Sequence, residues 1–266
     1  MSTSFLNKVV IITGSGSGIG KATALEFCKQ GANVILNGRN EDKLKKAVEE
    51  FRSLGCSVDH FVADVTDTEE CKKLVAFTIK TFGTINVLIT NASISMNARF
   101  DKMGATLFKK VLDSNIYGAT TPVFAAMDIL KQTKGSIVFI SSAAGLYGMP
   151  TASAYSAGKM SLTAISQSLR SELYKSGVHV GIVYVGFTEN DIDKKLLSEA
   201  GEWKSVPARP GILQQTQRSV ARSIVFMVKH RLQKRTLSLT GKTTSVLSRF
   251  FPWILGLAAV IAQRKD

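Results

Sequence analysis

Two hydrophobic patterns alternate along the first half of the chain: short apolar runs, and longer segments with apolar residues at helical spacing. The short runs are rich in β-branched and aromatic residues and fall at residues 8–13, 33–37, 57–63 and 86–90. Such runs are typical of strands covered on both faces of a sheet. The segments between them predict helices over residues 21–30, 41–54, 67–82 and 105–130. Four strands that each lead into a helix predict a parallel sheet with right-handed crossovers.

The second half continues the alternation. It predicts strands over residues 136–141, 178–185 and 235–239 and helices over residues 152–175 and 217–229. A chain of 266 residues can form one domain of this kind. The pattern therefore predicts an α/β fold with a seven-stranded parallel sheet and helices on both faces.

Residues 189–210 interrupt the alternation with mixed polarity, Trp203 and two prolines. Long insertions of this kind often cover a binding site. A mobile surface loop has the same composition, so both interpretations remain open. We assign this segment to a domain that spans residues 1–240, and we treat residues 241–266 as a separate basic and apolar tail.

A glycine-rich turn lies between the first strand and the first helix. Gly14, Gly16, Gly18 and Gly20 fall within seven residues there. Glycines at this point allow a tight turn and a close approach of a pyrophosphate, and the helix N-terminus faces the anion. Together with the strand pattern, the turn predicts a doubly wound Rossmann fold with a dinucleotide site.

The end of the second strand favours one form of dinucleotide. A site of this class usually carries an acidic residue there, which holds the ribose 2′-hydroxyl. This chain has Arg39 instead, and the first carboxylate after the strand is Glu41 at the start of the next helix. A guanidinium suits a 2′-phosphate by its charge and its forked donors. Unless Arg39 is an ordinary solvated residue, NADP(H) is favoured over NAD(H).

Three residues predict proton-transfer chemistry. Ser142 ends the strand at residues 136–141, and Tyr155 and Lys159 are four residues apart on the next helix. That spacing places both side chains on one helix face. A tyrosine hydroxyl needs a nearby cation to exchange protons at neutral pH. A serine hydroxyl could stabilise the oxygen on which charge develops. A surface tyrosine and lysine have the same spacing in many helices.

The formal charge of +14 and the pI of about 9.8 attract phosphorylated cofactors, anionic membranes or nucleic acid alike. No nucleic-acid-binding module is recognisable, so we expect no nucleic-acid partner. The three cysteines are widely spaced and show no metal-ligand pattern, which indicates a reducing compartment and no metal site. Residues 1–8 lack the apolar region of a secretory signal. We therefore expect a cytoplasmic protein.

From residue 7 to about residue 240 the chain resembles the short-chain dehydrogenase/reductases, of the family's common catalytic type. The resemblance rests on motifs in the family's order and spacing. These motifs are Thr13-Gly14-x-x-x-Gly18-Ile19-Gly20, Asp64-Val65, Asn91-Ala92, Asn115, Ser142 and Tyr155-x-x-x-Lys159.

The resemblance implies an NAD(P)-dependent enzyme that acts on CH–OH groups, with Asn115, Ser142, Tyr155 and Lys159 as catalytic residues. Tyr155 would exchange a proton with the substrate oxygen, and Lys159 would promote that exchange and hold the nicotinamide ribose. Ser142 would polarise the carbonyl, and Asn115 would help to position a relay water. The implied cofactor-binding residues are Gly14, Ser17, Gly18, Ile19, Gly20, Arg39, Asp64, Val65, Asn91, Tyr155, Lys159, Gly186 and Thr188.

Two positions depart from the family pattern. Ser93 stands where the family has glycine, and Val185 stands where it has proline. Neither change removes a catalytic group. We expect both to alter the shape of the substrate pocket rather than the chemistry.

The tail contains an apolar run at residues 246–262, interrupted by Pro252 and flanked by cations. The run is shorter than the roughly 20 residues that a spanning helix needs. Aromatic and apolar residues between cations suit a helix in a membrane interface. Packing on the body or on a partner subunit is the alternative. The tail loosely resembles those of steroid and 3-ketodihydrosphingosine reductases.

The leading functional hypothesis is an NADP(H)-dependent reductase of a lipophilic ketone or aldehyde in lipid metabolism. It would work reversibly, as a homo-dimer or homo-tetramer, with peripheral membrane contact through the tail. A second hypothesis keeps the chemistry for a soluble or acyl-carrier-bound carbonyl, with the tail in an oligomer interface. A non-catalytic nucleotide-binding protein is a third, and the intact catalytic set argues against it.

Overall fold

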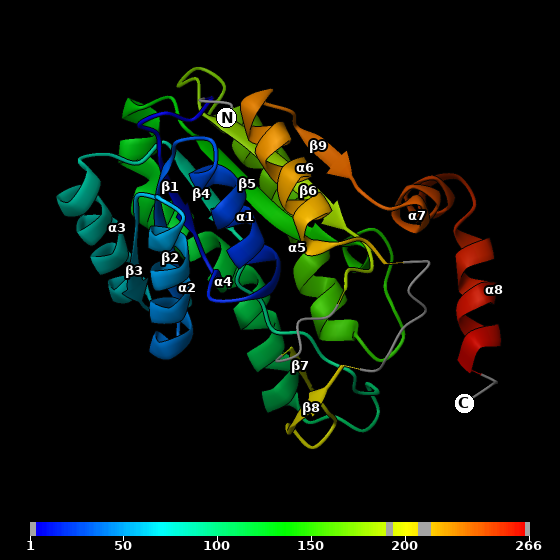
Figure 1. Cartoon of the computed structure of the whole chain (residues 1–266). Helices are drawn as coiled ribbons and strands as arrows, with labels where there is room; N and C mark the ends of the chain where they lie inside the picture. Colours follow the sequence, from blue (N-terminus) through cyan, green and yellow to red (C-terminus); the bar gives the residue numbers. More distant parts are fainter. Residues whose placement is uncertain (1–3, 190–193, 207–213, 264–266) are drawn as a thin grey trace.

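The computed structural model describes residues 4–189, 194–206 and 214–263. Its centre is a seven-stranded parallel sheet with the strand order β3-β2-β1-β4-β5-β6-β9 (Figure 1). The strands are β1 (Val9–Ile12), β2 (Asn33–Gly38), β3 (Val58–Val62), β4 (Val87–Thr90), β5 (Ser136–Ser142), β6 (His179–Val185) and β9 (Lys234–Thr236). The order reverses between β1 and β4, where sheets of this kind bind their ligands.

Helices cover both faces of the sheet. They are α1 (Gly18–Cys28), α2 (Glu41–Ser53), α3 (Thr68–Phe82), α4 (Ala105–Gln132), α5 (Ser153–Glu172) and α6 (Gln217–Lys229). Successive residues of a strand point to opposite faces. Ile12 accordingly packs in a core with α1, α2 and α6, and Ile11 packs in a second core with α3, α4 and α5. The predicted doubly wound Rossmann fold is confirmed.

The predicted irregular segment 189–210 contains a small antiparallel hairpin, β7 (Lys195–Leu197) and β8 (Trp203–Ser205). The prediction was therefore wrong for this part. The buried Leu197 fixes the hairpin to the loop after β4, because its N–H donates to the carbonyl of Ser95 at 3.0 Å and its carbonyl accepts from Asn97 at 2.9 Å. Residues 190–193 and 207–210 of the segment lie outside the described residues.

The C-terminal part differs from the prediction in its boundaries. The last strand ends at Thr236, not at residue 239, because Ser238 caps a new helix by accepting the N–H of Gly241 at 2.9 Å. This helix is α7 (Leu239–Phe250), and α8 (Pro252–Gln263) follows. Pro252 begins α8, where its fixed φ and missing N–H are tolerated.

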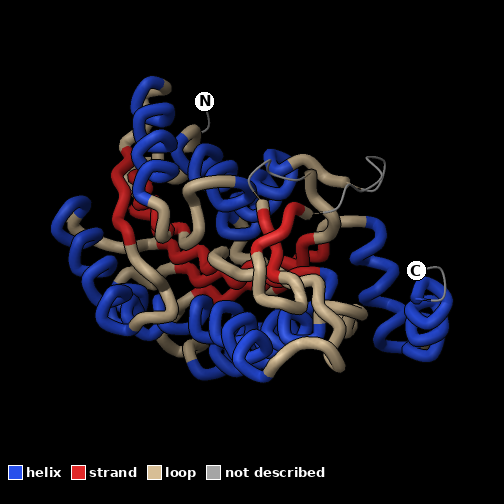
Figure 2. The backbone as a smooth tube through the Cα atoms, turned by 90° about the horizontal axis from the view of Figure 1, so that it is seen from below, coloured by secondary structure: helices blue, strands red, loops and turns tan. Residues whose placement is uncertain are grey.

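We call α7 and α8 together the tail helices. The chain bends by 119° between them. Among the described residues no single helix is long and apolar enough to cross a bilayer. The two tail helices meet both criteria only when they are taken together. In both views the tail helices project from the side of the body (Figures 1 and 2).

Candidate active site

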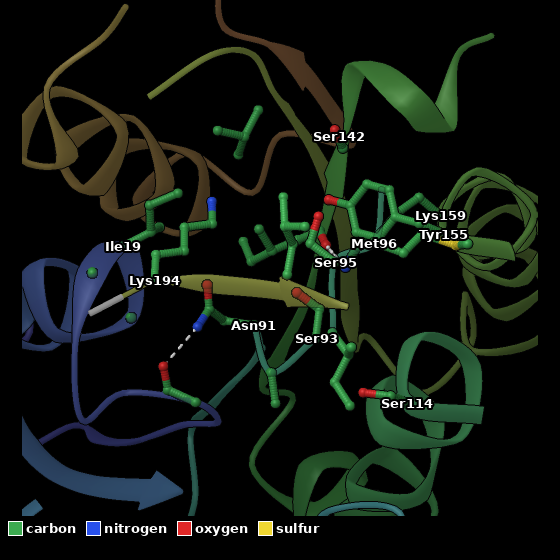
Figure 3. A pocket seen from close by; sticks show the side chains of 18 of the residues that line it. Ile19, Asn91, Ser93, Ser95, Met96, Ser114, Ser142, Tyr155, Lys159 and Lys194 are labelled. Carbon is green, nitrogen blue, oxygen red and sulfur yellow. Dashed lines mark hydrogen bonds between the residues drawn. The ribbon is translucent and has the colours of Figure 1, made fainter. Parts of the chain in front are cut away.

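A cavity of about 1210 Å³ lies at the carboxyl ends of the central strands. The glycine turn, the ends of β2, β4, β5 and β6, the start of α5 and the hairpin all contribute to its wall (Figure 3). Every predicted cofactor-binding residue lines it: Gly14, Ser17, Gly18, Ile19, Gly20, Arg39, Asp64, Val65, Asn91, Tyr155, Lys159, Gly186 and Thr188. Ser142 lines it too.

The catalytic side chains come from β5 and α5. Ser142 ends β5, and its Oγ accepts the N–H of Ala144 at 3.2 Å, which starts the 3₁₀ turn η1 (Ala143–Gly145). Tyr155 lies near the start of α5, and its hydroxyl points into the cavity (Figure 3). One turn later, the Nζ of Lys159 lies 5.8 Å from the centroid of the Tyr155 ring. The predicted juxtaposition of these side chains is therefore present.

Lys159 is a buried amine, with 3% of its surface exposed. Its Nζ donates to the carbonyl oxygen of Ile140 in β5 at 2.9 Å. Burial, and secondarily the nearby charge of Lys194, lowers the pKa of Lys159 to about 7. The amine can therefore change its protonation near neutral pH beside a phenol, which suits proton transfer.

Asn115 of α4 is fully buried and lies behind the catalytic residues rather than on the cavity wall described here. Its Nδ2 donates to the carbonyl oxygens of Ile94 and Val111, both at 2.8 Å. The bond to Ile94 fastens the loop after β4 to α4, and the bond to Val111 lies within α4. Its Oδ1 is buried and has no hydrogen-bond partner among the described residues. This oxygen can therefore accept a hydrogen bond from a donor that enters the site.

The glycine turn has a shape that side chains would destroy. Gly14 and Gly18 adopt φ of 62° and 57°, values that favour glycine. A β-carbon at Gly20 would overlap the carbonyl oxygen of Gly14 and lie 2.7 Å from Nδ2 of Asn91. Asn91 braces the turn from β4, because Nδ2 donates to the carbonyls of Thr13 at 3.0 Å and Gly14 at 2.9 Å. This cradle fits a pyrophosphate at the N-terminus of α1.

The end of the cavity beside β2 carries opposite charges. Nη1 of Arg39 lies 3.5 Å from Oδ2 of Asp64, and both side chains are partly exposed. Burial raises the pKa of the Asp64 carboxyl, but hydrogen bonds from the backbone and hydroxyl of Thr66 and the charge of Arg39 outweigh it, so the net pKa is lowered. Lys43 in the first turn of α2 lines the same end. Sequence reasoning missed Lys43; its position one turn after Arg39 was the available signal.

The substrate side of the cavity was the least predictable part. Lys194, just before the hairpin, lines the wall, and Figure 3 shows its side chain beside Ile19. Ser93 also lines the wall, as its position in the motif suggested. The apolar lining on this side is Ile94, Met96, Met149, Leu196 and Val206. Among the described residues, no group of three His, Cys, Asp or Glu side chains could hold a metal ion.

A loop glycine connects the cavity to the tail helices. Gly186 lines the cavity after β6, and a β-carbon there would overlap Oγ of Ser238 and lie 2.6 Å from its Cβ. Ser238 is the residue that caps α7. The tail helices therefore begin directly behind a predicted cofactor contact.

Comparisons with known proteins agree with this geometry. The short chain dehydrogenase family model matches residues 8–201. A 3-oxoacyl-[acyl-carrier-protein] reductase of Thermotoga maritima is 35% identical over 196 residues, which are 73% of this chain and 80% of that protein. An 11-beta-hydroxysteroid dehydrogenase-like protein of Arabidopsis thaliana is 38% identical over 204 residues, which are 75% of this chain and 67% of that protein.

Solved structures show the same fold. An alcohol dehydrogenase of Thermococcus sibiricus, complexed with 5-hydroxy-NADP, superposes on this chain with a TM-score of 0.75 at 22% sequence identity. The superposition covers 87% of this chain and 96% of the alcohol dehydrogenase. The match to the family model over most of the chain, the two relatives and the assembled serine, tyrosine and lysine lead to one conclusion. The chain belongs to the short-chain dehydrogenase family, and it is an oxidoreductase of CH–OH groups.

Proposed function

We propose that the protein is an NADP(H)-dependent oxidoreductase that reduces a lipophilic ketone or aldehyde and reversibly oxidises the corresponding alcohol. The observation that carries the reaction is the buried Lys159 amine beside the Tyr155 ring, at the wall of a cavity large enough for a dinucleotide and a substrate. Ser142 lines the same cavity.

In the reducing direction Tyr155 donates its hydroxyl proton to the substrate oxygen, and Ser142 stabilises the charge that develops there by a hydrogen bond. Lys159 favours the tyrosinate that remains. When bound, the nicotinamide cofactor supplies the hydride. Asn115 holds the loop after β4 through Ile94, and that loop forms part of the cavity wall and packs against the start of α5.

Two cations support the preference for NADP(H). Arg39 and Lys43 both line the end of the cavity beside β2, where a Rossmann fold holds the adenosine ribose. Asp64 offsets part of that charge through its ion pair with Arg39. A 2′-phosphate would add an anion between these cations and accept their hydrogen bonds.

The lining of the substrate side supports a lipophilic substrate. Met96 and Leu196 are buried apolar residues on this wall, and Met149 and Val206 add to it. Methionine side chains adapt to irregular apolar ligands. The hydroxysteroid dehydrogenase-like relative carries a name of the same substrate class.

A soluble or acyl-carrier-bound carbonyl is the second candidate. It is supported by the relative named 3-oxoacyl-[acyl-carrier-protein] reductase. Lys109 and Lys110 of α4 also line the cavity, and they could contact an anionic carrier. The chemistry of Tyr155 and Lys159 would be the same for this substrate.

We also propose that the protein forms a homo-dimer or homo-tetramer. Tyr117 and Phe124 of α4 are exposed, the latter by 75%, and their spacing places them on one helix face. An apolar helix face of this kind would be covered by a second subunit. Size-exclusion chromatography with light scattering tests this, and a monomer at micromolar concentration would contradict it.

The activity is tested by following oxidation of NADPH and NADH with a steroid ketone, a long-chain 3-keto lipid, a 3-oxoacyl thioester and a small soluble ketone. We expect turnover with NADPH and the first two substrates. Turnover confined to the thioester or the small ketone would favour the second candidate. No turnover with any carbonyl, together with intact cofactor binding, would overturn the proposed function.

A further inference from the structure

The positive charge of the protein is concentrated in its C-terminal part. Residues 203–265 contain 12 of the 34 lysines and arginines and no aspartate or glutamate. Residues 1–202 contain 22 lysines and arginines against 19 acids, so they are nearly neutral. The acid-free stretch contributes β8, α6, β9 and the tail helices. Such an asymmetry indicates an anionic partner for this part of the molecule.

The same part exposes a run of large apolar side chains that lie close together in the sequence. On the tail helices, exposed aromatic residues sit close to the bend, with Trp253 exposed by 67%. Aliphatic residues continue the surface along both helices. The exposed set is Leu239, Val246, Phe250, Phe251, Trp253, Leu257, Val260 and Ile261. Exposed apolar clusters of this kind mark interaction surfaces.

The tail helices are attached to the rim of the catalytic cavity. Ser238, the cap of α7, packs against Gly186 after β6. A β-carbon at Gly256 of α8 would lie 3.5 Å from the hydroxyl of Tyr147, which follows η1 in the loop between Ser142 and α5. The tail helices therefore contact two loops that flank the active site.

A second feature lies between α6 and β9. We call it the arginine groove, a hollow of about 370 Å³ whose lining carries three arginines and three hydroxyls and no acid. Its residues are Thr216, Arg218, Ser219, Arg222, Ser223, Phe226 and Arg235. The guanidinium of Arg235 stacks on the Phe226 ring at 4.7 Å, and Arg222 reaches Glu26 only at 3.9 Å. Converging guanidinium and hydroxyl groups are suited to a phosphate.

We propose that the tail helices and the arginine groove form one surface that binds an anionic lipid bilayer. In Figure 1 β9 and the tail helices follow from α6 in turn toward the right-hand edge of the molecule. The tail helices would lie in the interface with their apolar residues among the acyl chains, because neither can span the bilayer alone. Trp253 would lie at the level of the headgroups. The arginine groove would take a headgroup phosphate.

Charge decides between a bilayer and a second copy of this chain. Two copies joined through this surface would bring together two acid-free, cationic segments, and the lining of the groove holds no carboxylate to neutralise them. An anionic bilayer neutralises the same charges. The surface also places the cavity rim beside the membrane, so a lipophilic substrate could enter from it. This last point rests on the proposed function, whereas the binding itself does not.

The first experiment is co-sedimentation of the full chain with vesicles of phosphatidylcholine alone, or with phosphatidylglycerol added. We expect binding to the anionic vesicles that weakens with salt. Trp253→Glu and Leu257→Glu should each lower the affinity at least about tenfold. Arg222→Gln should lower binding to anionic vesicles only. Leu54→Glu is the matched control, because Leu54 is an exposed leucine before β3, at the opposite edge of the sheet, and should bind as the parent does.

The second measurement does not depend on charged variants. The chain has two tryptophans, so Trp203→Phe leaves Trp253 as the only one. Its fluorescence should shift to the blue on anionic vesicles and be quenched by lipids brominated on the acyl chains. Absence of both effects, with no sedimentation of the parent chain, would overturn the proposal.

Loss of a dimer in Trp253→Glu with unchanged vesicle binding would also overturn the proposal, and would assign the surface to a second copy. Neither vesicle measurement needs cofactor or substrate. Failure of the membrane proposal therefore leaves the proposed reductase activity standing, and failure of the carbonyl panel leaves vesicle binding standing.

Discussion

Gly158 of α5 lies directly against Asn115 of α4, so that a β-carbon at Gly158 would be 2.6 Å from Cβ of Asn115. The backbone of α5 at Gly158 thus rests on the side chain of Asn115, with no side chain of α5 in between. Because Tyr155 and Lys159 flank Gly158 on α5, this close contact sets how far both project into the cavity.

We expect Gly158→Ala to push α5 away from α4 and to lower kcat at least tenfold. Overpacking of this kind costs about 1–3 kcal/mol, so the Tm should also fall. Steady-state kinetics and thermal unfolding measure the two effects. Gly104→Ala is the control, because nothing lies within 4 Å of the added carbon, and it should keep the parent turnover. Equal kcat in both variants would show that the contact does not position the catalytic residues.

Tyr155→Phe should reduce turnover by a factor of about 10³ or more, since removal of a general acid–base typically costs 10²–10⁴. The ring remains, so packing beside Lys159 is preserved. Binding of NADPH, followed by titration calorimetry, should stay nearly unchanged. Retained reductase activity of this variant on any accepted carbonyl would refute the assigned role of Tyr155.

Arg39→Ala should weaken binding of NADPH more than binding of NADH, because only NADPH carries the 2′-phosphate. A charge-assisted bond to phosphate is worth about 1.5–3 kcal/mol, which corresponds to roughly 10–150-fold in Kd. Lys43→Ala should act in the same direction. Isothermal titration with both cofactors provides the measurement. Equal losses for NADPH and NADH in the Arg39 variant would remove the 2′-phosphate role.

Lys159 should make the cofactor-free protein more stable as the pH rises above 7. Its pKa is lowered to about 7 in the folded state from the usual lysine value of 10.5. Between these values only the unfolded chain keeps the proton, so this residue adds up to about 1.4 kcal/mol of stability per pH unit. Below pH 7 the buried Lys159 amine carries its positive charge, and the full desolvation cost of that charge lowers the stability of the fold.

Lys159→Met removes this titration. The free energy of unfolding of the variant minus that of the parent should therefore be most positive near pH 6 and should fall between pH 7 and pH 9. The lost hydrogen bond to Ile140 shifts the difference by an amount that does not depend on pH. Chemical denaturation at each pH provides the measurement. A constant difference over this range would show that Lys159 keeps its ordinary pKa.

The sheet and the cofactor side of the site could be predicted because local pattern determines them. Uninterrupted apolar strands such as the one containing Ile11 and Ile12 need cover on both faces, and this requirement dictates the helices. The glycine turn and the Tyr155–Lys159 spacing are short-range features whose geometry follows from the elements that hold them. The structure accordingly brings the glycine turn, Tyr155 and Lys159 to one cavity.

The substrate side could not be predicted to the same degree. Leu197 and Met96 meet only because the hairpin folds back on the loop after β4, and no periodicity in the sequence specifies that contact. The last strand was misplaced because Ser238 is compatible with a strand but caps α7. The prediction that Asn115 would position a water stays a prediction, since the structure defines its role only through Ile94 and Val111.

The brace between Asn91 and the glycine turn has a consequence for biosynthesis. Besides the Asn91 side-chain bonds, the hydroxyl of Thr13 accepts the N–H groups of Asn91 and Ala92, both at 3.0 Å, from residues 78 and 79 positions later in the chain. A growing polypeptide that has emerged only through α3 thus carries the phosphate-binding sequence without its shape. We therefore expect that added dinucleotide will not stabilise a chain that is truncated before β4.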